Sequence, residues 1–343
     1  MKFSSLYAIV YVNFIIWFKK LFKLKVVPYK ALLNLTDLCN SRCNFCDIWK
    51  INPENEINLK EISNIFKSFN RHLYWLSLSG GEITLVKYYK EMIDELIQNC
   101  KNIKILAFTT NALAVNRALE YALYAKNKGL DVLVTISLDG DESTHDELRG
   151  VKGNYKKCFD LYYKLKKNNI NCNFGITVSE QNSNFILKKY SEYKNLIKAV
   201  TFVHNHGIFG ISKNLENKNI ITSLEHIYKN YPLNKLEHLI EKIHLKISIL
   251  FLKNNREKNI VPCDVINSSV HIMPNGDVKP CMFMESLGNI RNENINQILN
   301  SNNTKKVKEA IKKNNCPKCW MNCYSPHAIM QHPIKSVFKY IFN

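Results

Sequence analysis

The 343-residue sequence contains no internal repeat, no extended low-complexity tract and no apolar run long enough to span a membrane. A spanning helix needs about 20 apolar residues, whereas the apolar run at residues 6–18 is short and is broken by Asn13. A signal peptide is not indicated either, because the positive charges follow this run instead of preceding it. These absences, with 46% apolar and 22% charged residues, predict an ordinary globular chain.

Acidic residues are scarce relative to basic ones, 29 against 48, which gives a net charge of +19. The lysines are spread along polar helix faces and no recognised nucleic-acid motif is present, so we expect no nucleic-acid partner. Residues 1–28 and 329–343 each combine apolar side chains with lysines, which favours amphipathic helices at an anionic membrane surface. The alternative is that each helix packs on the core of the protein itself. The chain is therefore expected in the cytoplasm, peripheral on the inner face of the membrane.

Eleven cysteines are many for this length, and most of them are clustered. Cys39, Cys43 and Cys46 lie within eight residues, and five more lie between residues 263 and 323. Spacings as tight as C-x3-C and C-x2-C favour metal or iron–sulfur ligation in a reducing compartment over disulfides.

Short apolar runs alternate with helical stretches after Pro28, which predicts parallel strands covered by helices. We expect strands at residues 30–36, 73–79, 103–110, 131–138, 171–178 and 198–205. We expect helices near residues 58–69, 86–99, 115–128, 154–168 and 182–196. Six such units are too few for a closed eightfold barrel, so the predicted α/β fold is a partial (β/α)6 TIM-like barrel.

Beyond this barrel the pattern changes, and two extended runs around Asn275-Gly276 predict a hairpin. The hairpin would begin a small cysteine-rich α+β domain. The expected order is a basic amphipathic segment (1–28), the barrel core (29–210), a helical connection (211–260), the cysteine-rich domain (261–328) and an amphipathic tail (329–343).

Polar motifs follow the first four predicted strands. The three-cysteine stretch follows the first, "SGGE" (79–82) the second, "TTNA" (109–112) the third and "SLDG" (137–140) the fourth. Because the carboxyl ends of parallel strands share one edge of a sheet, we expect these motifs to meet there.

Three thiolates hold zinc only with a fourth ligand, and no His follows at the usual spacing. Three cysteines can instead hold a four-iron cluster whose last iron is open to a small molecule. The pattern C-x3-C-x-Phe-C at Cys39 to Cys46, followed by GGE after the second strand, resembles the radical S-adenosylmethionine (SAM) superfamily. The resemblance covers about residues 30–205. It implies a [4Fe-4S] cluster that binds SAM and, on one-electron reduction, cleaves it to methionine and a 5′-deoxyadenosyl radical.

The resemblance also implies roles for eight further residues. Phe45 would lie near the adenine; Gly80 and Gly81 would let the backbone approach the methionine amino group, supported by Glu82; Asn111, Ser137 and Asp139 would make polar contacts; and Arg149 would pair with the SAM carboxylate. From the residues alone, a strand-end hydrogen bond or a turn is an equal alternative for Asn111, Ser137 and Asp139.

The later cysteines resemble the SPASM or twitch domains that follow many radical SAM cores. Cys263 and Cys281 frame Gly276 as C-x12-G-x4-C, and "CPKCWMNC" supplies Cys316, Cys319 and Cys323. The full SPASM pattern has seven cysteines, so five imply one auxiliary [4Fe-4S] cluster held by four of them. A zinc ribbon is the alternative.

We therefore expect an enzyme that abstracts hydrogen from an unactivated carbon, with an electron donor such as flavodoxin or ferredoxin. The amphipathic ends favour a lipid or lipid-linked substrate, and the alternative is a peptide maturase acting on a ribosomally made peptide. A non-enzymatic iron–sulfur electron carrier or a zinc-stabilised structural protein would explain the cysteines but not the GGE and Arg149 motifs.

Overall fold

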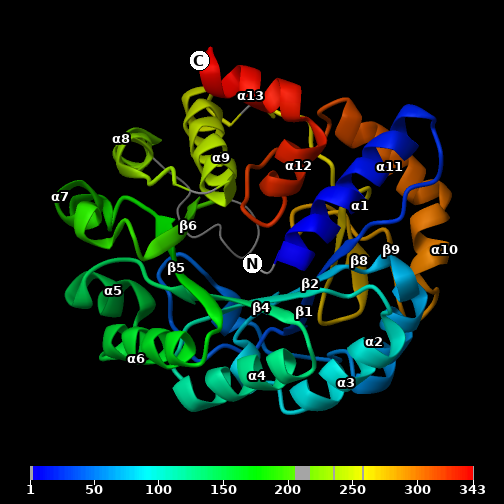
Figure 1. Cartoon of the computed structure of the whole chain (residues 1–343), viewed down its shortest axis with the longest axis horizontal. Coiled ribbons are helices and arrows are strands. Elements are labelled where there is room, and N and C mark those ends of the chain that lie inside the picture. Colours follow the sequence, from blue (N-terminus) through cyan, green and yellow to red (C-terminus); the bar gives the residue numbers. More distant parts are fainter. Residues whose placement is uncertain (1–2, 205–216, 235, 257–258, 343) are drawn as a thin grey trace.

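The computed structural model describes residues 3–204, 217–234, 236–256 and 259–342, and within them it has one nine-stranded sheet (Figure 1). The strands are β1 (Lys30–Thr36), β2 (Trp75–Gly80), β3 (Ile105–Thr110), β4 (Asp131–Ser137), β5 (Asn171–Val178), β6 (Ile197–Phe202), β7 (Ser269–Ile272), β8 (Asp277–Lys279) and β9 (Gly288–Asn289). Their order is β6-β5-β4-β3-β2-β1-β7-β8-β9, and β1 to β6 are parallel. The prediction of an α/β partial barrel is confirmed.

Helices follow the strands along the outer side of this sheet (Figure 1). They are α2 (Leu59–Phe69), α3 (Tyr89–Asn99), α4 (Val115–Asn127), α5 (Glu142–Arg149), α6 (Asn154–Lys167), α7 (Ser183–Tyr193), α8 (Asn217–Asn230) and α9 (Leu236–Lys253). Two of them have side-chain caps at their beginnings. In α2 a capping box joins Asn58, whose side chain accepts from the Glu61 N–H, to Glu61, whose side chain accepts from the Asn58 N–H; in α5 the Asp141 side chain accepts from the Thr144 N–H.

The two faces of the sheet differ in exposure. In β2, β3 and β4 the residues that face the helices are buried and apolar, whereas the alternate residues remain partly accessible. Near the strand beginnings, Trp75, Ile105 and Leu133 belong to or pack on an apolar cluster with the N-terminal helix. The accessible positions further along the strands carry small or polar side chains, namely Ser77, Ser79, Ala107, Thr109 and Thr135. The inner face of the partial barrel is therefore open to a ligand toward the ends of these strands.

The C-terminal segment continues the same sheet. β7 pairs in parallel with β1, and β7 and β8 form the predicted antiparallel hairpin, whose turn contains Gly276 at φ +85°. The remaining helices are α10 (Ile295–Asn300), α11 (Asn302–Lys312), α12 (Ser325–Gln331) and α13 (Pro333–Ile341). The segment before α12 reaches the opposite edge of the core, where Asn322 Nδ2 donates to the Val200 carbonyl of β6 (2.6 Å), and α12 itself packs on α9. The C-terminal segment thus contacts both edges of the six-stranded core. The predicted boundary at residue 210 lies outside the described residues.

The N-terminal helix α1 (Phe3–Leu21) lies across the beginnings of the strands. Its Ile9, Val12 and Ile16 form a small apolar cluster with Tyr29, just before β1, and Ile105, the first residue of β3. The alternative that this helix packs on the protein itself is therefore correct for one of its faces. No helix within the described ranges is both long and apolar enough to cross a membrane.

Candidate active site

A loop of residues 37–47, here called the cysteine loop, leaves β1 and carries Cys39, Cys43 and Cys46. The GGE motif at the end of β2 holds the start of this loop through its backbone. The Gly81 N–H donates to the Thr36 carbonyl (2.7 Å), and the Glu82 N–H donates to the Leu38 carbonyl (2.7 Å). The loop is thereby fixed beside the end of β2.

The two glycines are required by this close approach. A Cβ atom at Gly80 would lie 2.4 Å from the Thr36 carbonyl oxygen, and one at Gly81 would lie 1.9 Å from the Leu38 carbonyl oxygen. Both distances are too short for any side chain. The resemblance assigned the glycines to SAM, and the structure gives them a role in seating the cysteine loop. The contact to SAM stays a prediction.

Glu82 is buried and joins the ends of β2 and β3. Its carboxylate accepts hydrogen bonds from the Thr110 hydroxyl (2.7 Å), the Asn111 N–H (2.8 Å) and both the N–H and hydroxyl of Thr84 (3.2 and 2.8 Å). Burial raises the pKa of Glu82, and these hydrogen bonds act in the opposite direction. The side chain of Asn111 in turn donates to Asn40 Oδ1 in the cysteine loop (2.8 Å). Glu82 therefore positions Asn111 against the loop.

Helix α5 holds the other side of the cysteine loop, and sequence analysis did not predict this helix. The Asn44 N–H donates to the Leu148 carbonyl and the Arg42 N–H to the Arg149 carbonyl, each at 3.0 Å. Gly150, at φ +64°, ends the helix in the left-handed conformation that suits glycine. A Cβ there would lie 2.8 Å from the Arg42 backbone oxygen, so the helix end and the loop fit closely.

Arg149 and Asp139 form a buried ion pair beside the cysteines. Arg149 Nε lies 2.6 Å from Asp139 Oδ2, and the Thr177 N–H donates to Asp139 Oδ1 (2.8 Å). Arg149 also reaches Cys43, with Nη1 3.6 Å from Sγ, and its guanidinium lies 5.3 Å from the ring centre of Phe45. Burial alone would lower the pKa of Arg149, but the nearby Asp139 and Cys43 favour its positive charge, so its pKa is raised overall.

Behind Asp139 lie buried polar residues that sequence analysis missed. Nδ1 of His145 accepts from the Asp139 N–H (3.1 Å), and the Asn182 side chain donates to the Asp139 carbonyl (3.0 Å). Burial lowers the pKa of His145 to about 4, so it is neutral at pH 7 and able to accept this hydrogen bond. Such residues carry no motif, and only the folded backbone brings them together. Ser137 lies at the end of β4, where it is buried and pairs with Gly175.

The chemistry of the cysteine loop fits a metal cluster. Burial raises the pKa of Cys46 to about 11 and also raises that of Cys39, with the neighbouring thiols adding to both effects. Thiols in such a place become thiolates when a metal displaces their protons. Throughout the described part of the chain, no three His, Cys, Asp or Glu side chains lie close enough to hold a metal ion as they stand.

The five later cysteines lie near the β7–β8 hairpin and the segment before α12. Burial raises the pKa of Cys263 to about 12, and Cys281 and Cys316 act on it electrostatically. The pKa of Cys319 is raised well above the usual value, chiefly by burial and further by the charges of the four other cysteines. The segment is anchored to the barrel, since Lys30 Nζ donates to the Cys323 carbonyl (3.0 Å) and Trp320 Nε1 to the His244 carbonyl (3.1 Å).

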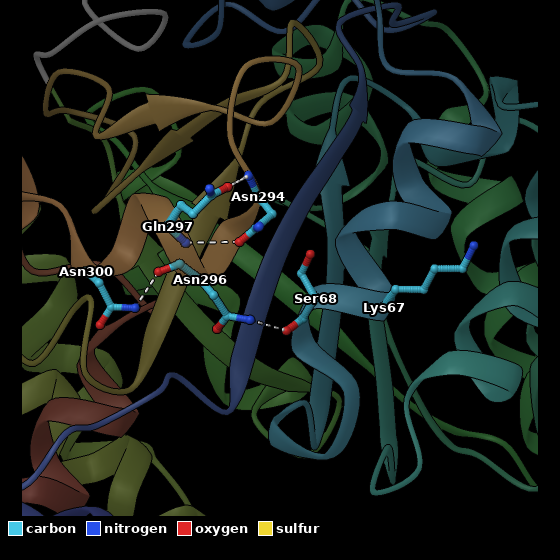
Figure 2. Close-up of a pocket in the computed structure, with 6 residues that line it drawn as sticks. All are labelled: Lys67, Ser68, Asn294, Asn296, Gln297 and Asn300. Atoms are coloured by element: carbon cyan, nitrogen blue, oxygen red, sulfur yellow. Dashed lines mark hydrogen bonds between the residues drawn. The ribbon is translucent and has the colours of Figure 1, made fainter.

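A surface hollow between α2 and α10 is remote from this chemistry. Figure 2 shows its polar lining, in which Asn296 Nδ2 donates to the Ser68 carbonyl (3.0 Å) and Asn294 and Gln297 cap α10. None of the predicted site residues lines it. The hollow therefore marks where the C-terminal segment docks on the barrel.

Two family profiles match the chain. The radical SAM superfamily matches residues 33–183, and the SPASM iron–sulfur cluster-binding domain matches residues 263–324. These ranges contain every residue predicted for the site.

Curated relatives match part of the chain. The sporulation killing factor maturation protein SkfB of Bacillus subtilis is 30% identical over 160 residues, which cover 46% of this chain and 37% of the relative. GTP 3′,8-cyclase of Pasteurella multocida is 30% identical over 155 residues, covering 41% of this chain and 44% of the relative. The match thus spans less than half the length of each of these relatives.

A solved structure resembles the fold over almost the whole chain. It is anSMEcpe with bound AdoMet and the Kp18Cys peptide, with a TM-score of 0.64, 17% identity, and coverage of 92% of this chain and 97% of that one. At this identity the likeness concerns the fold.

Proposed function

The chain is a member of the radical SAM superfamily with a C-terminal SPASM iron–sulfur domain, and from that premise we propose that it matures a peptide by abstracting hydrogen from an unactivated carbon. The main structural support for this proposal is that the GGE motif, Asn111 and α5 all contact the cysteine loop, and that Arg149 lies beside Cys43 and Phe45. The matches to a peptide-maturation protein and to a fold that holds a peptide support the substrate class.

The chain's own residues would position the reaction. When bound, the [4Fe-4S] cluster and SAM supply the 5′-deoxyadenosyl radical. We propose that Cys39, Cys43 and Cys46 hold this cluster and that Phe45, Gly80, Gly81, Glu82, Asn111, Ser137, Asp139 and Arg149 surround SAM. Arg149 offers a fixed planar cation suited to a carboxylate, because Asp139 already holds one side of its guanidinium.

The accessible inner face of the barrel would receive the substrate. Ser79, Thr109 and Thr135 leave room there and offer hydroxyl groups that can orient a polar chain such as a peptide. Their strands end at the same edge from which the cysteine loop departs. A substrate lying on this face would be next to the SAM site, as hydrogen abstraction requires.

Two other substrates are less well supported. The lipid-linked substrate was suggested by the apolar ends of the chain, but α1 packs at the beginnings of the strands, away from the cysteine loop. A nucleotide substrate is suggested by the GTP 3′,8-cyclase match, which covers 41% of this chain. The SPASM match favours a substrate site completed by the C-terminal domain.

We further propose that four of Cys263, Cys281, Cys316, Cys319 and Cys323 hold one auxiliary [4Fe-4S] cluster. Cys281 is buried and the other four are half-buried, and neighbouring cysteines raise the pKa of Cys263 and of Cys319, which supports a shared site. The cluster would accept an electron or orient the substrate, and a flavodoxin or ferredoxin would reduce the enzyme.

The substrate class can be tested with the reconstituted, reduced protein. SAM is added with an extract of host cells that lack the enzyme, and 5′-deoxyadenosine is measured. We expect the extract to stimulate its formation, protease treatment of the extract to abolish the stimulation, and organic extraction of lipids to leave it intact. Stimulation that survives protease but is removed with the lipids would contradict a peptide substrate.

A matched pair of variants separates this result from background. Cys43→Ser removes a proposed cluster ligand, whereas Cys100→Ser changes a buried cysteine in the apolar core between α3 and β3. We expect stimulation to be lost in the first variant and retained in the second.

A further inference from the structure

Helix α1 is apolar on two opposite faces, and only one of them is covered. Ile9, Val12 and Ile16 are buried against the barrel. The opposite face exposes aromatic side chains, including Phe14 (59% exposed) and Trp17 (48%). The full set of large exposed apolar residues on and just after this helix is Tyr7, Val10, Tyr11, Phe14, Trp17, Phe18, Leu21, Phe22 and Leu24. An exposed set of this kind on a soluble protein marks an interaction site.

Helix α13 adds a second exposed apolar face. Its large exposed residues are Ile334, Val337, Phe338, Ile341 and, just after it, Phe342. α12 packs on both α1 and α13 and so places the two helices near each other. The Lys20 side chain of α1 also acts electrostatically on His332, the residue that precedes α13. We call the exposed residues of the two helices the terminal apolar surface.

The two terminal segments that carry this surface have charge of one sign, and the acidic partner that the structure records for α1 is the buried Asp264, 2.6 Å from Lys20. No Asp or Glu precedes Asp37, and none follows Glu309. Lys23 and Lys25 are exposed just after α1, and Lys335 is exposed on α13. A surface rimmed in this way is complementary to negatively charged lipid headgroups, with aromatic rings suited to the boundary between headgroups and acyl chains.

We propose that the terminal apolar surface docks the enzyme on an anionic membrane, with α1 and α13 lying in the interface. Neither helix is long and apolar enough to span it. The aliphatic and aromatic side chains would enter the headgroup boundary while the lysines meet the lipid phosphates. The terminal segments contribute no acidic side chain to the described part of this surface, which favours this occupant over a second copy of the chain, because two such surfaces facing each other would bring like charges together.

This docking would fix the orientation of the active site. α1 contacts Tyr29 and Ile105, at the beginnings of strands, whereas the cysteine loop departs from the opposite end of β1. A membrane on the exposed face of α1 would therefore lie on the far side of the barrel from the cysteine loop. The substrate would reach the site from the aqueous phase, so the proposal is independent of whether that substrate is a peptide.

Vesicle flotation of the reconstituted full-length protein tests the proposal. We expect it to float with vesicles of equal phosphatidylglycerol and phosphatidylcholine and to stay in solution with phosphatidylcholine alone. The double variant F14S/W17S should lower the partition coefficient at least tenfold. A control, Y163S/L187S, removes exposed apolar side chains from α6 and α7 (64% and 41% exposed) and should bind as the unaltered protein does.

Charge is tested separately with K23Q/K25Q, which should weaken binding about tenfold, against K101Q/K313Q, which changes exposed lysines elsewhere. No flotation with anionic vesicles, or equal loss in the F14S/W17S and Y163S/L187S variants, would overturn the proposal. So would a dimer that F14S/W17S dissociates without any effect on flotation. SAM cleavage in the absence of vesicles should be unchanged in F14S/W17S, so failure here leaves the peptide proposal standing.

Discussion

Arg149 gives the sharpest prediction, because its removal leaves Asp139 buried without a counter-charge. In an Arg149→Met variant, Asp139 keeps only the Thr177 N–H among the partners of its carboxylate that the structure records. It must then stay ionised in a buried site without a counter-charge or become protonated. Protonating a carboxyl of ordinary pKa at pH 7 costs about 4 kcal/mol, at about 1.4 kcal/mol per pH unit. Breaking a buried pair by removing one partner typically costs about 3–5 kcal/mol.

We therefore expect Arg149→Met to lower the free energy of unfolding by about 3–4 kcal/mol, measured by urea denaturation of the metal-free protein. The second variant, Asp139→Asn, keeps an oxygen that can accept from Thr177 while it removes the negative charge. In the double variant Arg149→Met/Asp139→Asn no buried charge remains. The two changes should then be non-additive, with a coupling of at least about 1.5 kcal/mol.

The same variant has a functional consequence. Arg149→Met should also weaken SAM binding at least tenfold. Arg149→Lys keeps the charge but not the planar guanidinium, so its affinity for SAM should lie between those of the unaltered protein and Arg149→Met. Binding is measured by titrating SAM into the reconstituted protein and following its cluster spectrum. A loss of stability below about 1 kcal/mol, or additive effects in the double variant, would refute the argument from the buried pair.

Three further outcomes follow from the structure. Glu82→Gln places an NH2 group where a carboxylate oxygen now accepts from a buried N–H, so it should lower the free energy of unfolding by about 1–3 kcal/mol, measured in urea. His145 has a pKa of about 4 in the folded protein and of 6.5 in the unfolded chain, so its contribution to stability is present above pH 6.5 and is lost as the pH falls toward 4. Between these values the free energy of unfolding should fall by up to about 1.4 kcal/mol per pH unit. His145→Asn should reduce this slope between pH 6.5 and 5, measured by urea denaturation at a series of pH values. Single Ser substitutions of Cys263, Cys281, Cys316, Cys319 and Cys323 should leave about four irons per chain in four variants and about eight in the fifth, measured by iron analysis, and full iron in all five would refute the shared cluster.

The sequence predicted the barrel well because its signals are local. The predicted strands at 30–36 and 171–178 coincide with β1 and β5, and those at 73–79, 103–110 and 131–138 begin and end within two residues of β2, β3 and β4. The strand predicted at 198–205 begins one residue after the start of β6, and residue 205 lies outside the described residues. Short apolar runs separated by stretches of helical periodicity predict such strands and helices without information from distant parts of the chain.

The sequence was less informative about contacts between distant segments. That β7 pairs with β1 depends on backbone hydrogen bonds between residues more than 200 positions apart, which no periodic pattern reports. The contacts of Gly81 and α5 with the cysteine loop also join segments far apart in the sequence, so no local pattern predicts them. α1 was predicted to be amphipathic, and it is apolar on both faces, so a choice between core and membrane could not be made from its composition alone.

The central claim is that Cys39, Cys43 and Cys46 hold an iron–sulfur cluster that cleaves SAM to a radical, and one measurement tests it directly. The anaerobically reconstituted protein is reduced, SAM is added, and 5′-deoxyadenosine is quantified together with the electron paramagnetic resonance signal of the cluster. We predict 5′-deoxyadenosine and a signal altered by SAM, both lost in the triple Ala variant of these cysteines, which should retain about four irons in the auxiliary site. No 5′-deoxyadenosine and an unchanged signal from the fully loaded protein would contradict the account.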